Sequence, residues 1–164
     1  MPIVIRPATA ADQPTISALV RDARLNPFRL HWRDFLVADV DGRIAGIGQV
    51  RPHGDGSREL SSLVVTGECR GTGIGSQIVW ALLAREAEPT YLFCREALTP
   101  FYARFGFSVA EGQRLPRGLA RMLRLGNLMT STEALFSGHH IRIVAMRRDL
   151  PTPPALPSNA PPAI

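Results

Sequence analysis

Apolar and polar residues alternate along four short segments in the first 65 positions, and a period of two predicts β-strands. The four segments are residues 3–7, 35–39, 45–50 and 59–65. Asp41-Gly42 separates the second segment from the third and is typical of a tight hairpin turn. We therefore expect an antiparallel hairpin in the first half of the chain.

A second period, with apolar residues three or four positions apart, predicts a helix between the first two strands. Ile16, Leu19 and Val20 form the apolar stripe of this helix, which begins near Asp12 and extends to about residue 24. We also expect a turn and a short second helix in residues 26–34.

Beyond residue 65, helical segments separate the strands. We expect helices at residues 71–87 and 99–105, and strands at residues 91–94, 107–110 and 141–146. The strand before the helix at 71–87 and the strand after it form a strand–helix–strand unit, so these two strands should run parallel. The sheet is therefore expected to be mixed, and the fold class is α/β (α+β).

The length of 164 residues and the hydrophobic content of 45% are typical of one globular domain. We place this domain at residues 1–150. Residues 151–164 hold six of the 14 prolines, and we expect a disordered tail there. No apolar run approaches the ~18 residues of a membrane helix, and the N-terminus lacks the pattern of a signal peptide. We therefore expect a cytoplasmic protein with no membrane partner.

All 19 basic residues are arginines, and the formal net charge is +5. This charge is compatible with an anionic ligand or with nucleic acid. The arginines are scattered along the chain, however, so we expect no nucleic-acid partner. Cys69 and Cys94 lack metal-binding spacing and are interpreted as buried packing residues. The adjacent His139 and His140 would diverge on a strand, so we expect no metal site.

A glycine-rich segment, Arg70-Gly-Thr-Gly-Ile-Gly-Ser76, joins the strand at 59–65 to the helix that follows. Its small residues let backbone N–H groups approach an anion, and the helix N-terminus adds partial positive charge. The pattern predicts a phosphate or pyrophosphate site. A P-loop is excluded because the chain has no lysine. A dinucleotide-binding fingerprint needs a third glycine where Ser76 stands, which disfavours that site. A glycine-rich turn with no ligand is the remaining alternative.

Two separated motifs resemble those of the GNAT family of acetyl-CoA-dependent N-acyltransferases. The family's pyrophosphate motif, Arg/Gln-x-x-Gly-x-Gly/Ala, is matched by Arg70, Gly73 and Gly75. Its Phe-Tyr-x-x-x-Gly-Phe signature is matched by residues 101–107. The resemblance implies a mixed, mostly antiparallel sheet flanked by helices, in which the parallel strands 4 and 5 splay apart.

The resemblance also implies which residues bind acetyl-CoA, the expected cosubstrate. Backbone groups of Leu63 and Val65, on the fourth strand, would bind the pantetheine arm and the thioester carbonyl, with the Val65 N–H as the oxyanion donor. The loop that follows would hold the pyrophosphate. Its residues are Arg70, Gly71, Thr72, Gly73, Ile74, Gly75 and Ser76.

The implied activity is transfer of an acetyl group to a primary amine of a small molecule, with amino acids among the candidates. The amine attacks directly, through a tetrahedral intermediate. Tyr102 stands at the position of the family's usual general acid, which protonates the departing thiolate. Glu59 stands where some members carry a general base, and the alternative is an ordinary strand-end glutamate that faces solvent.

The sequence says less about the site that would bind the acceptor amine. By resemblance it includes residues 26–32, with Arg29 and His31 as candidate substrate residues, and the long connection at 112–140. Within that connection Pro116 and Gly126 are expected to bound a helix. Its arginine face indicates either a solvated cap helix or an arginine-rimmed cleft for an anionic amine.

Two other functions stay open at this stage. One is a catalytically silent module that binds acyl-CoA as a sensor, and the other is a nicotinamide-dependent oxidoreductase that uses the glycine loop. Many family members form homodimers, but no segment of this sequence identifies an interface.

Overall fold

The computed structural model describes residues 2–110, 115–124 and 142–150. Its strands are β1 (Ile3–Pro7), β2 (Phe35–Val40), β3 (Arg43–Pro52), β4 (Arg58–Val65), β5 (Thr90–Arg95), β6 (Ser108–Val109) and β7 (Ile143–Arg148). Its α-helices are α1 (Gln13–Asp22), α2 (Ile74–Leu83) and α3 (Thr99–Ala103). Short 3₁₀ turns are η1 (Ala10–Asp12), η2 (Trp32–Asp34), η3 (Gly67–Cys69) and η4 (Glu96–Leu98).

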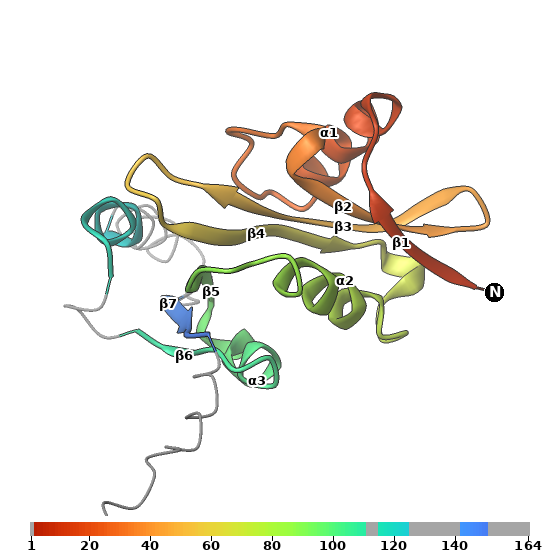
Figure 1. Cartoon of the computed structure of the whole chain (residues 1–164). Helices are drawn as coiled ribbons and strands as arrows, with labels where there is room; N and C mark the ends of the chain where they lie inside the picture. Colours follow the sequence, from red (N-terminus) through yellow and green to blue (C-terminus); the bar gives the residue numbers. More distant parts are fainter. Residues whose placement is uncertain (1, 111–114, 125–141, 151–164) are drawn as a thin grey trace, which may run out of the picture.

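The strands form one sheet in the order β1-β2-β3-β4-β5-β7-β6. All neighbours are antiparallel except β4 and β5, which are parallel, as the strand–helix–strand unit predicts. Helix α1 covers one face of the sheet and α2 covers the other (Figure 1). The fold class expected from the sequence is therefore confirmed.

Each face of the sheet has its own apolar core. On the α1 face, Ile16 and Val20 pack with Phe35, Val37 and Ile47. On the α2 face the buried cluster is larger and extends to α3. It contains Leu36, Val50, Leu60, Ile74, Ile78, Leu82, Leu92 and Tyr102.

Two glycines of β3 let α2 lie close to the sheet. A Cβ atom at Gly48 would lie 2.8 Å from Ile78 Cγ2, and one at Gly46 would lie 3.0 Å from Ile74 Cγ2. Any larger residue at Gly48 would therefore collide with the helix. The close packing fixes the start of α2, and with it the glycine loop, against the end of β4.

The parallel pair is short. β4 and β5 are in register only from Arg58–Thr90 to Leu60–Leu92, and beyond this point the two strands separate. The register between β3 and β4 shifts by one residue before Val64, at Ser62, which has a φ of 54°. Gln49 Nε2 donates a hydrogen bond of 3.0 Å to Ser62 Oγ. This bulge bends β4 locally, and the predicted splay between strands 4 and 5 is confirmed.

The hairpin turn is as predicted, with positive φ at Asp41 (50°) and Gly42 (78°). The turn and the short second helix predicted in residues 26–34 are present, as a turn at 28–29 and the helix η2, but this helix is 3₁₀ and not α. Pro27 disfavours helical backbone at Asn26, and Gln13 holds the segment in place. Its Nε2 donates to the Leu30 carbonyl, and its Oε1 accepts from the Trp32 N–H.

Helix α2 is shorter than the predicted range of 71–87. It begins at Ile74 because Gly71 and Gly73 have φ values of 79° and 86°, which no helix accommodates. Residues 71–73 therefore form a loop that precedes the helix. The helix ends at Leu83, and Glu86, three residues later, accepts two hydrogen bonds from Arg58, at 2.6 and 2.9 Å.

Part of the predicted connection helix is described. Residues 117–124 are helical, with Leu119 buried and Arg117, Arg121 and Arg124 exposed. This segment lies beside the turn between β3 and β4 (Figure 1). Gly126, the pair His139-His140 and the tail at 151–164 lie outside the described residues.

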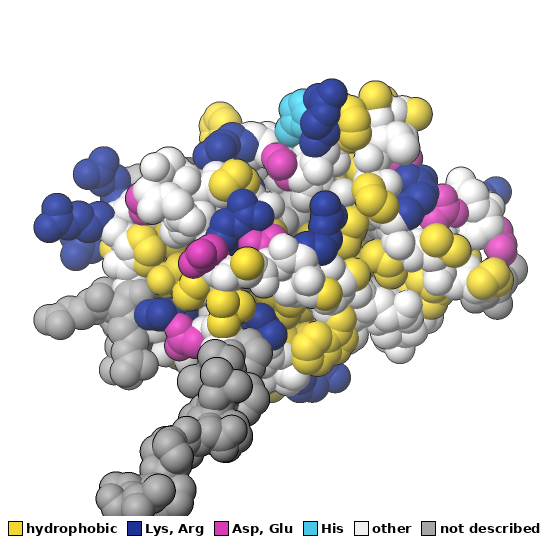
Figure 2. Space-filling model, in the orientation of Figure 1, with side chains coloured by type: hydrophobic (Ala, Val, Ile, Leu, Met, Phe, Trp, Pro, Cys, Tyr) yellow, Lys and Arg dark blue, Asp and Glu magenta, His cyan; other side chains and the backbone are white. Residues whose placement is uncertain are grey.

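Arginine side chains are dispersed over the surface rather than gathered into one basic patch on the face shown in Figure 2. Within the described part of the chain, no helix is long and apolar enough to cross a membrane. In the same part, no group of three histidine, cysteine or carboxylate side chains could hold a metal ion.

Candidate functional site

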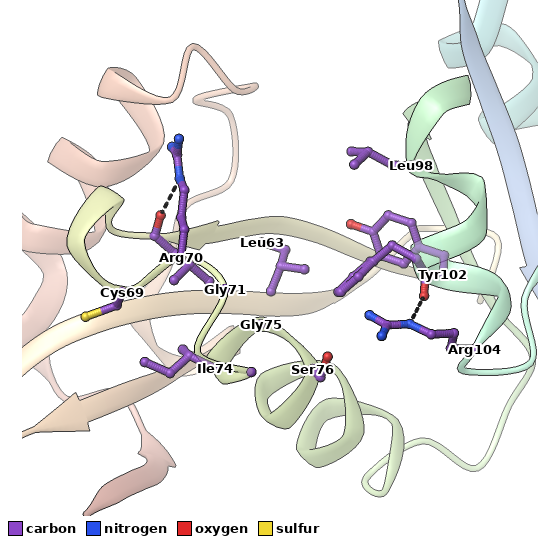
Figure 3. Close-up of a pocket in the computed structure, with 13 residues that line it drawn as sticks. Leu63, Cys69, Arg70, Gly71, Ile74, Gly75, Ser76, Leu98, Tyr102 and Arg104 are labelled. Atoms are coloured by element: carbon purple, nitrogen blue, oxygen red, sulfur yellow. Dashed lines mark hydrogen bonds between the residues drawn. The ribbon is translucent and has the colours of Figure 1, made fainter. Parts of the chain in front are cut away.

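A cavity of about 520 Å³ opens where β4 and β5 separate, between the end of β4, the start of α2, and α3 (Figure 3). Its lining comes from two separate stretches of the sequence, the end of β4 with the loop that follows it (63–76) and the segment around α3 (98–104). The lining residues are Leu63, Val65, Cys69, Arg70, Gly71, Gly73, Ile74, Gly75, Ser76, Leu98, Phe101, Tyr102 and Arg104. The cavity therefore brings the glycine loop and Tyr102 into one site, as the two sequence motifs predict.

The glycine loop forms one end of the cavity. Positive φ values at Gly71 and Gly73 turn the backbone into the N-terminus of α2. Thr72 does not line the cavity, because its Oγ1 donates a 2.6 Å hydrogen bond back to the Cys69 carbonyl. The first N–H groups of a helix have no partner within the helix, so those of Ile74, Gly75 and Ser76 are available to an anion.

Gly75 differs from the other two loop glycines. A Cβ atom there would lie 3.5 Å from Val65 Cγ2 and 3.9 Å from Phe101 Cζ, which is ordinary van der Waals contact. At Gly71 and Gly73 the space is open, but their backbone conformation is strained for any other residue. The conformational requirement for glycine is therefore strongest at Gly71 and Gly73.

The end of β4 forms the wall of the cavity. The Thr66 N–H donates to the Ala45 carbonyl of β3 at 2.9 Å. Backbone groups of successive residues in a strand point alternately to the two sides, so those of Val65 point away from β3. The Val65 carbonyl accepts from Arg70 Nε at 3.4 Å. Beyond Leu60 no strand of the described residues pairs with β4 on this side, so the Val65 N–H faces the gap left by β5.

Tyr102 lies across the gap from β4. Its ring extends from α3 toward Leu63 (Figure 3) and is 8% exposed. The ring packs edge-on against Phe101 and Phe107. Burial raises the pKa of the phenol above its usual value, and the nearby Cys94 thiol raises it further. The hydroxyl is therefore a neutral proton donor at physiological pH.

Glu59 lies on β4 but does not line the cavity. It is 3% exposed, so the alternative that the sequence left open, a glutamate facing solvent, is wrong. Its Oε2 lies 2.6 Å from His53 Nε2, and its Oε1 accepts from Arg51 Nη2 at 3.3 Å. Arg51 Nη1 also donates to the Phe28 carbonyl, so this buried ion pair fixes the loop after α1 to the sheet.

Arg29 and His31 lie on that exposed loop, and neither lines the cavity. Arg29 has a φ of 58°, and the His31 ring stacks on Trp32. The structure brings together most of the predicted cofactor residues and Tyr102. It does not bring Glu59, Arg29 or His31 into the same cavity.

The two cysteines differ in their surroundings. Cys94 is buried beside Met146, and burial raises the pKa of its thiol to about 11, as expected of a packing residue. Cys69 packs against the core as predicted, but it is only half-buried and also lines the cavity next to the glycine loop. The turn η3, which precedes the loop, holds it at the surface.

Sequence reasoning missed four residues of the lining, namely Cys69, Leu98, Phe101 and Arg104. Phe101 both packs against the core and lines the cavity. For Leu98 and Phe101 the signal was available in the spacing, because positions 98, 101 and 102 are three and four apart and so share one helical face.

Comparison with known proteins agrees with this geometry. Residues 31–109 match a family model described as an acetyltransferase (GNAT) domain. A search of the curated proteins finds no match. Solved structures with the same fold include N-acetylglutamate synthase from Neisseria gonorrhoeae, in complex with coenzyme A and N-acetyl-glutamate. It aligns with a TM-score of 0.74 and 18% identity over 93% of this chain and 36% of that chain.

Two other structures are similar over nearly their whole length. Rv2747 from Mycobacterium tuberculosis, in complex with CoA and NLQ, has a TM-score of 0.67 and 23% identity over 90% of this chain and 99% of that chain. Ard1 from Thermoplasma volcanium has a TM-score of 0.63 and 14% identity over 93% of this chain and 100% of that chain.

This chain spans about a third of the length of the Neisseria synthase, so it is similar to one part of that protein. At these identities the structural likeness shows the fold. The family model, the splayed parallel pair and the glycine loop at the start of α2 agree with one another. The chain therefore resembles the GNAT family of acetyltransferases, with a family-model match at residues 31–109 and the same fold.

Proposed function

We propose that this protein transfers an acetyl group from acetyl-CoA to a primary amine of a small molecule. The observation that carries the proposal is the single cavity that joins the glycine loop, the unpaired side of β4 and the Tyr102 phenol. Similar proteins are described in complex with CoA, and one of them also with N-acetyl-glutamate. These neighbours support a CoA ligand and an amino acid among the acceptors.

The residues of the cavity fit the parts of acetyl-CoA. The N–H groups at the start of α2 suit the pyrophosphate, because they combine unpaired donors with the positive end of the helix dipole. The backbone of Leu63 and Val65 suits the amide-bearing pantetheine arm. When it binds, acetyl-CoA supplies a thioester whose carbonyl the Val65 N–H would polarise.

Tyr102 is the proposed general acid. Its raised pKa keeps the phenol protonated, so that it can donate a proton to the leaving sulfur. Glu59 remains the candidate general base. Because Glu59 lies outside the cavity, a proton would reach it through His53, which is 2.6 Å from its carboxylate, or through water.

The test is an acetyl-transfer assay with acetyl-CoA and a panel of primary amines. Replacing Tyr102 with Phe should lower kcat about 100-fold, at the lower end of the range for loss of a general acid. The melting-temperature shift caused by CoA should stay as in the wild type, because the phenyl ring still fills the same space. Loss of activity from ionisation of Tyr102 should occur only above pH 10.

An unchanged kcat in Tyr102→Phe would remove the phenol from the mechanism. CoA binding without transfer to any amine would instead favour the silent acyl-CoA sensor.

A further inference from the structure

Four buried side-chain atoms lack a hydrogen-bond partner within the described residues. They are Gln49 Oε1, Arg51 Nε, Ser61 Oγ and Arg147 Nε. Arg51 Nε does lie 3.3 Å from the Glu59 carboxylate, but not in hydrogen-bonding geometry. Buried polar groups without partners are rare, and each one costs stability unless a ligand or water satisfies it.

The sheet register places all four on one face. Arg51 is opposite Glu59, Glu59 is opposite Tyr91, and Tyr91 is opposite Arg147, so these residues form a row across β3, β4, β5 and β7. Gln49 and Ser61 are opposite each other two positions farther along β3 and β4. Residues opposite each other, or two apart on a strand, share a face. This face of the sheet is the one that α1 covers, because Gln49 is also opposite Phe35, which packs with Ile16 and Val20 of α1.

These six residues, which we call the polar row, lie next to the gap between β4 and β5. The pair Glu59–Tyr91 is followed by one more pair before the strands separate, so Ser61 is the first residue of β4 that faces the gap. The cavity of Leu63 and Tyr102 opens on the opposite face, where Leu63 packs close to Gly48 under α2. A group that enters from the polar row would therefore meet the cavity ligand through the gap.

The positive charges of the row differ in how they are paired. The Arg51 charge is neutralised by Glu59, and both residues are buried. Arg147 lies over the Tyr91 ring, with its guanidinium carbon 5.8 Å from the ring centre. Its Nη2 contacts Asp149, which is 68% exposed, and its Nε has no partner. An exposed partner is held weakly, so Arg147 has a fork of Nε and Nη2 that can bind another carboxylate.

We propose that the acceptor lies on this polar row and that Arg147 binds a carboxylate of the acceptor. The acceptor is then an amine that carries a carboxylate, such as an α-amino acid. Gln49 and Ser61 follow Arg51 and Glu59 along β3 and β4 toward the gap, and the unpartnered Ser61 Oγ and Gln49 Oε1 suit the amine end. This inference rests on the proposed acetyl transfer and names the class of its substrate and a residue that selects it.

The experiment compares the common L-amino acids with their α-amides, which lack the carboxylate charge. Each compound is tested as an acceptor with acetyl-CoA, and its effect on the melting temperature is measured in the presence of CoA. The wild type should prefer at least one amino acid over its amide by tenfold or more in kcat/KM. Arg147→Gln should remove this preference by raising the acceptor KM, with the CoA-induced shift unchanged.

Arg147→Lys separates recognition from folding, because it keeps the charge and most of the packing but loses the planar fork. It should keep the wild-type melting temperature and lose most of the preference. Arg142→Gln is the matched control, since Arg142 precedes β7 and is exposed in an ion pair with Glu96. It should behave as the wild type.

The outcomes distinguish the two proposals. A protein that binds CoA but shows no preference for the amino acid over the amide, in transfer or in binding, would overturn the role of Arg147 alone. The same holds if Arg147→Gln and Arg142→Gln behave alike. A protein that shows no CoA-induced shift and no transfer would overturn the proposed function itself.

Discussion

Asp12 connects the first strand to the turn before α1 through one carboxylate, and its partner Arg6 also reaches β2. Its Oδ2 accepts hydrogen bonds from Arg6 Nη1 at 2.8 Å and from the Thr9 N–H at 2.7 Å, and Arg6 also binds Asp39. The Arg6 hydrogen bond is the main reason that the pKa of Asp12 is lowered to about 2. The charged form is therefore the one that the folded state stabilises.

Because the folded pKa is lower than the unfolded one, this stabilisation is complete above about pH 4 and is lost as the pH falls toward 2. We expect Asp12→Asn to lower the free energy of unfolding by about 1–2 kcal/mol at pH 7. The difference from the wild type should shrink below pH 3. Urea denaturation at several pH values measures both effects. Asp22→Asn, at an exposed position, should change neither, and a difference that is independent of pH would contradict the account.

Single residues with special chemistry were the easier part to predict from the sequence. Tyr102 and the glycines of the loop belong to short motifs of consecutive residues. Such a motif can be recognised in the sequence without knowing how the rest of the chain folds. The partners of Glu59 could not be predicted in this way. Arg51 and His53 reach it only because β3 and β4 pair in one register, and that register depends on a bulge at Ser62 for which the sequence has no clear signal.

At the scale of elements, the glycine loop offers a matched pair of variants. Gly73→Ala places a Cβ on a residue with a φ of 86°, which costs about 1–2 kcal/mol in strain or shifts the loop. Gly75→Ala adds a methyl group in ordinary contact with Val65. Isothermal titration with CoA should show a Kd at least tenfold weaker for Gly73→Ala and nearly unchanged for Gly75→Ala. Equal affinities in the two variants would contradict a role for the loop backbone in binding.

The packing of α2 on β3 gives another test at this scale. Gly48→Val would force its side chain into Ile78, so α2 must shift away from the sheet. Overpacking of this kind costs about 1–3 kcal/mol. We expect a lower melting temperature and weaker CoA binding, because the loop moves with the helix. Gly54→Ala, where the space is open, is the control. A stable Gly48→Val variant with normal CoA binding would show that α2 need not lie so close.

Strands were predicted better than connections. Alternation of apolar residues located each of the seven strands to within two or three residues, since that pattern reflects burial against one face. Residues 26–34, where the short helix is 3₁₀ and not α, show the limit. That segment takes its conformation from Gln13 and Arg51, which are far away in sequence, and not from its own spacing.

For the whole molecule, the separation of β4 from β5 explains the arrangement of the site. One face supplies the glycine loop and Tyr102, the other supplies the polar row that contains Arg147, and the gap between the strands joins them. The sequence predicted the splay through family resemblance. It could not predict the polar row, because the row combines residues from four strands, and only the register brings them to one face.

The central claim is that the cavity binds acetyl-CoA, and the most direct test is the melting temperature with acetyl-CoA, CoA or NAD at matched concentrations. A ligand at ~100 times its Kd stabilises the folded state by ~2.7 kcal/mol, which for a domain of this size is roughly 5–10 °C. We expect shifts of this size with acetyl-CoA and CoA and none with NAD. A shift with NAD alone, or with none of the three, would contradict the account.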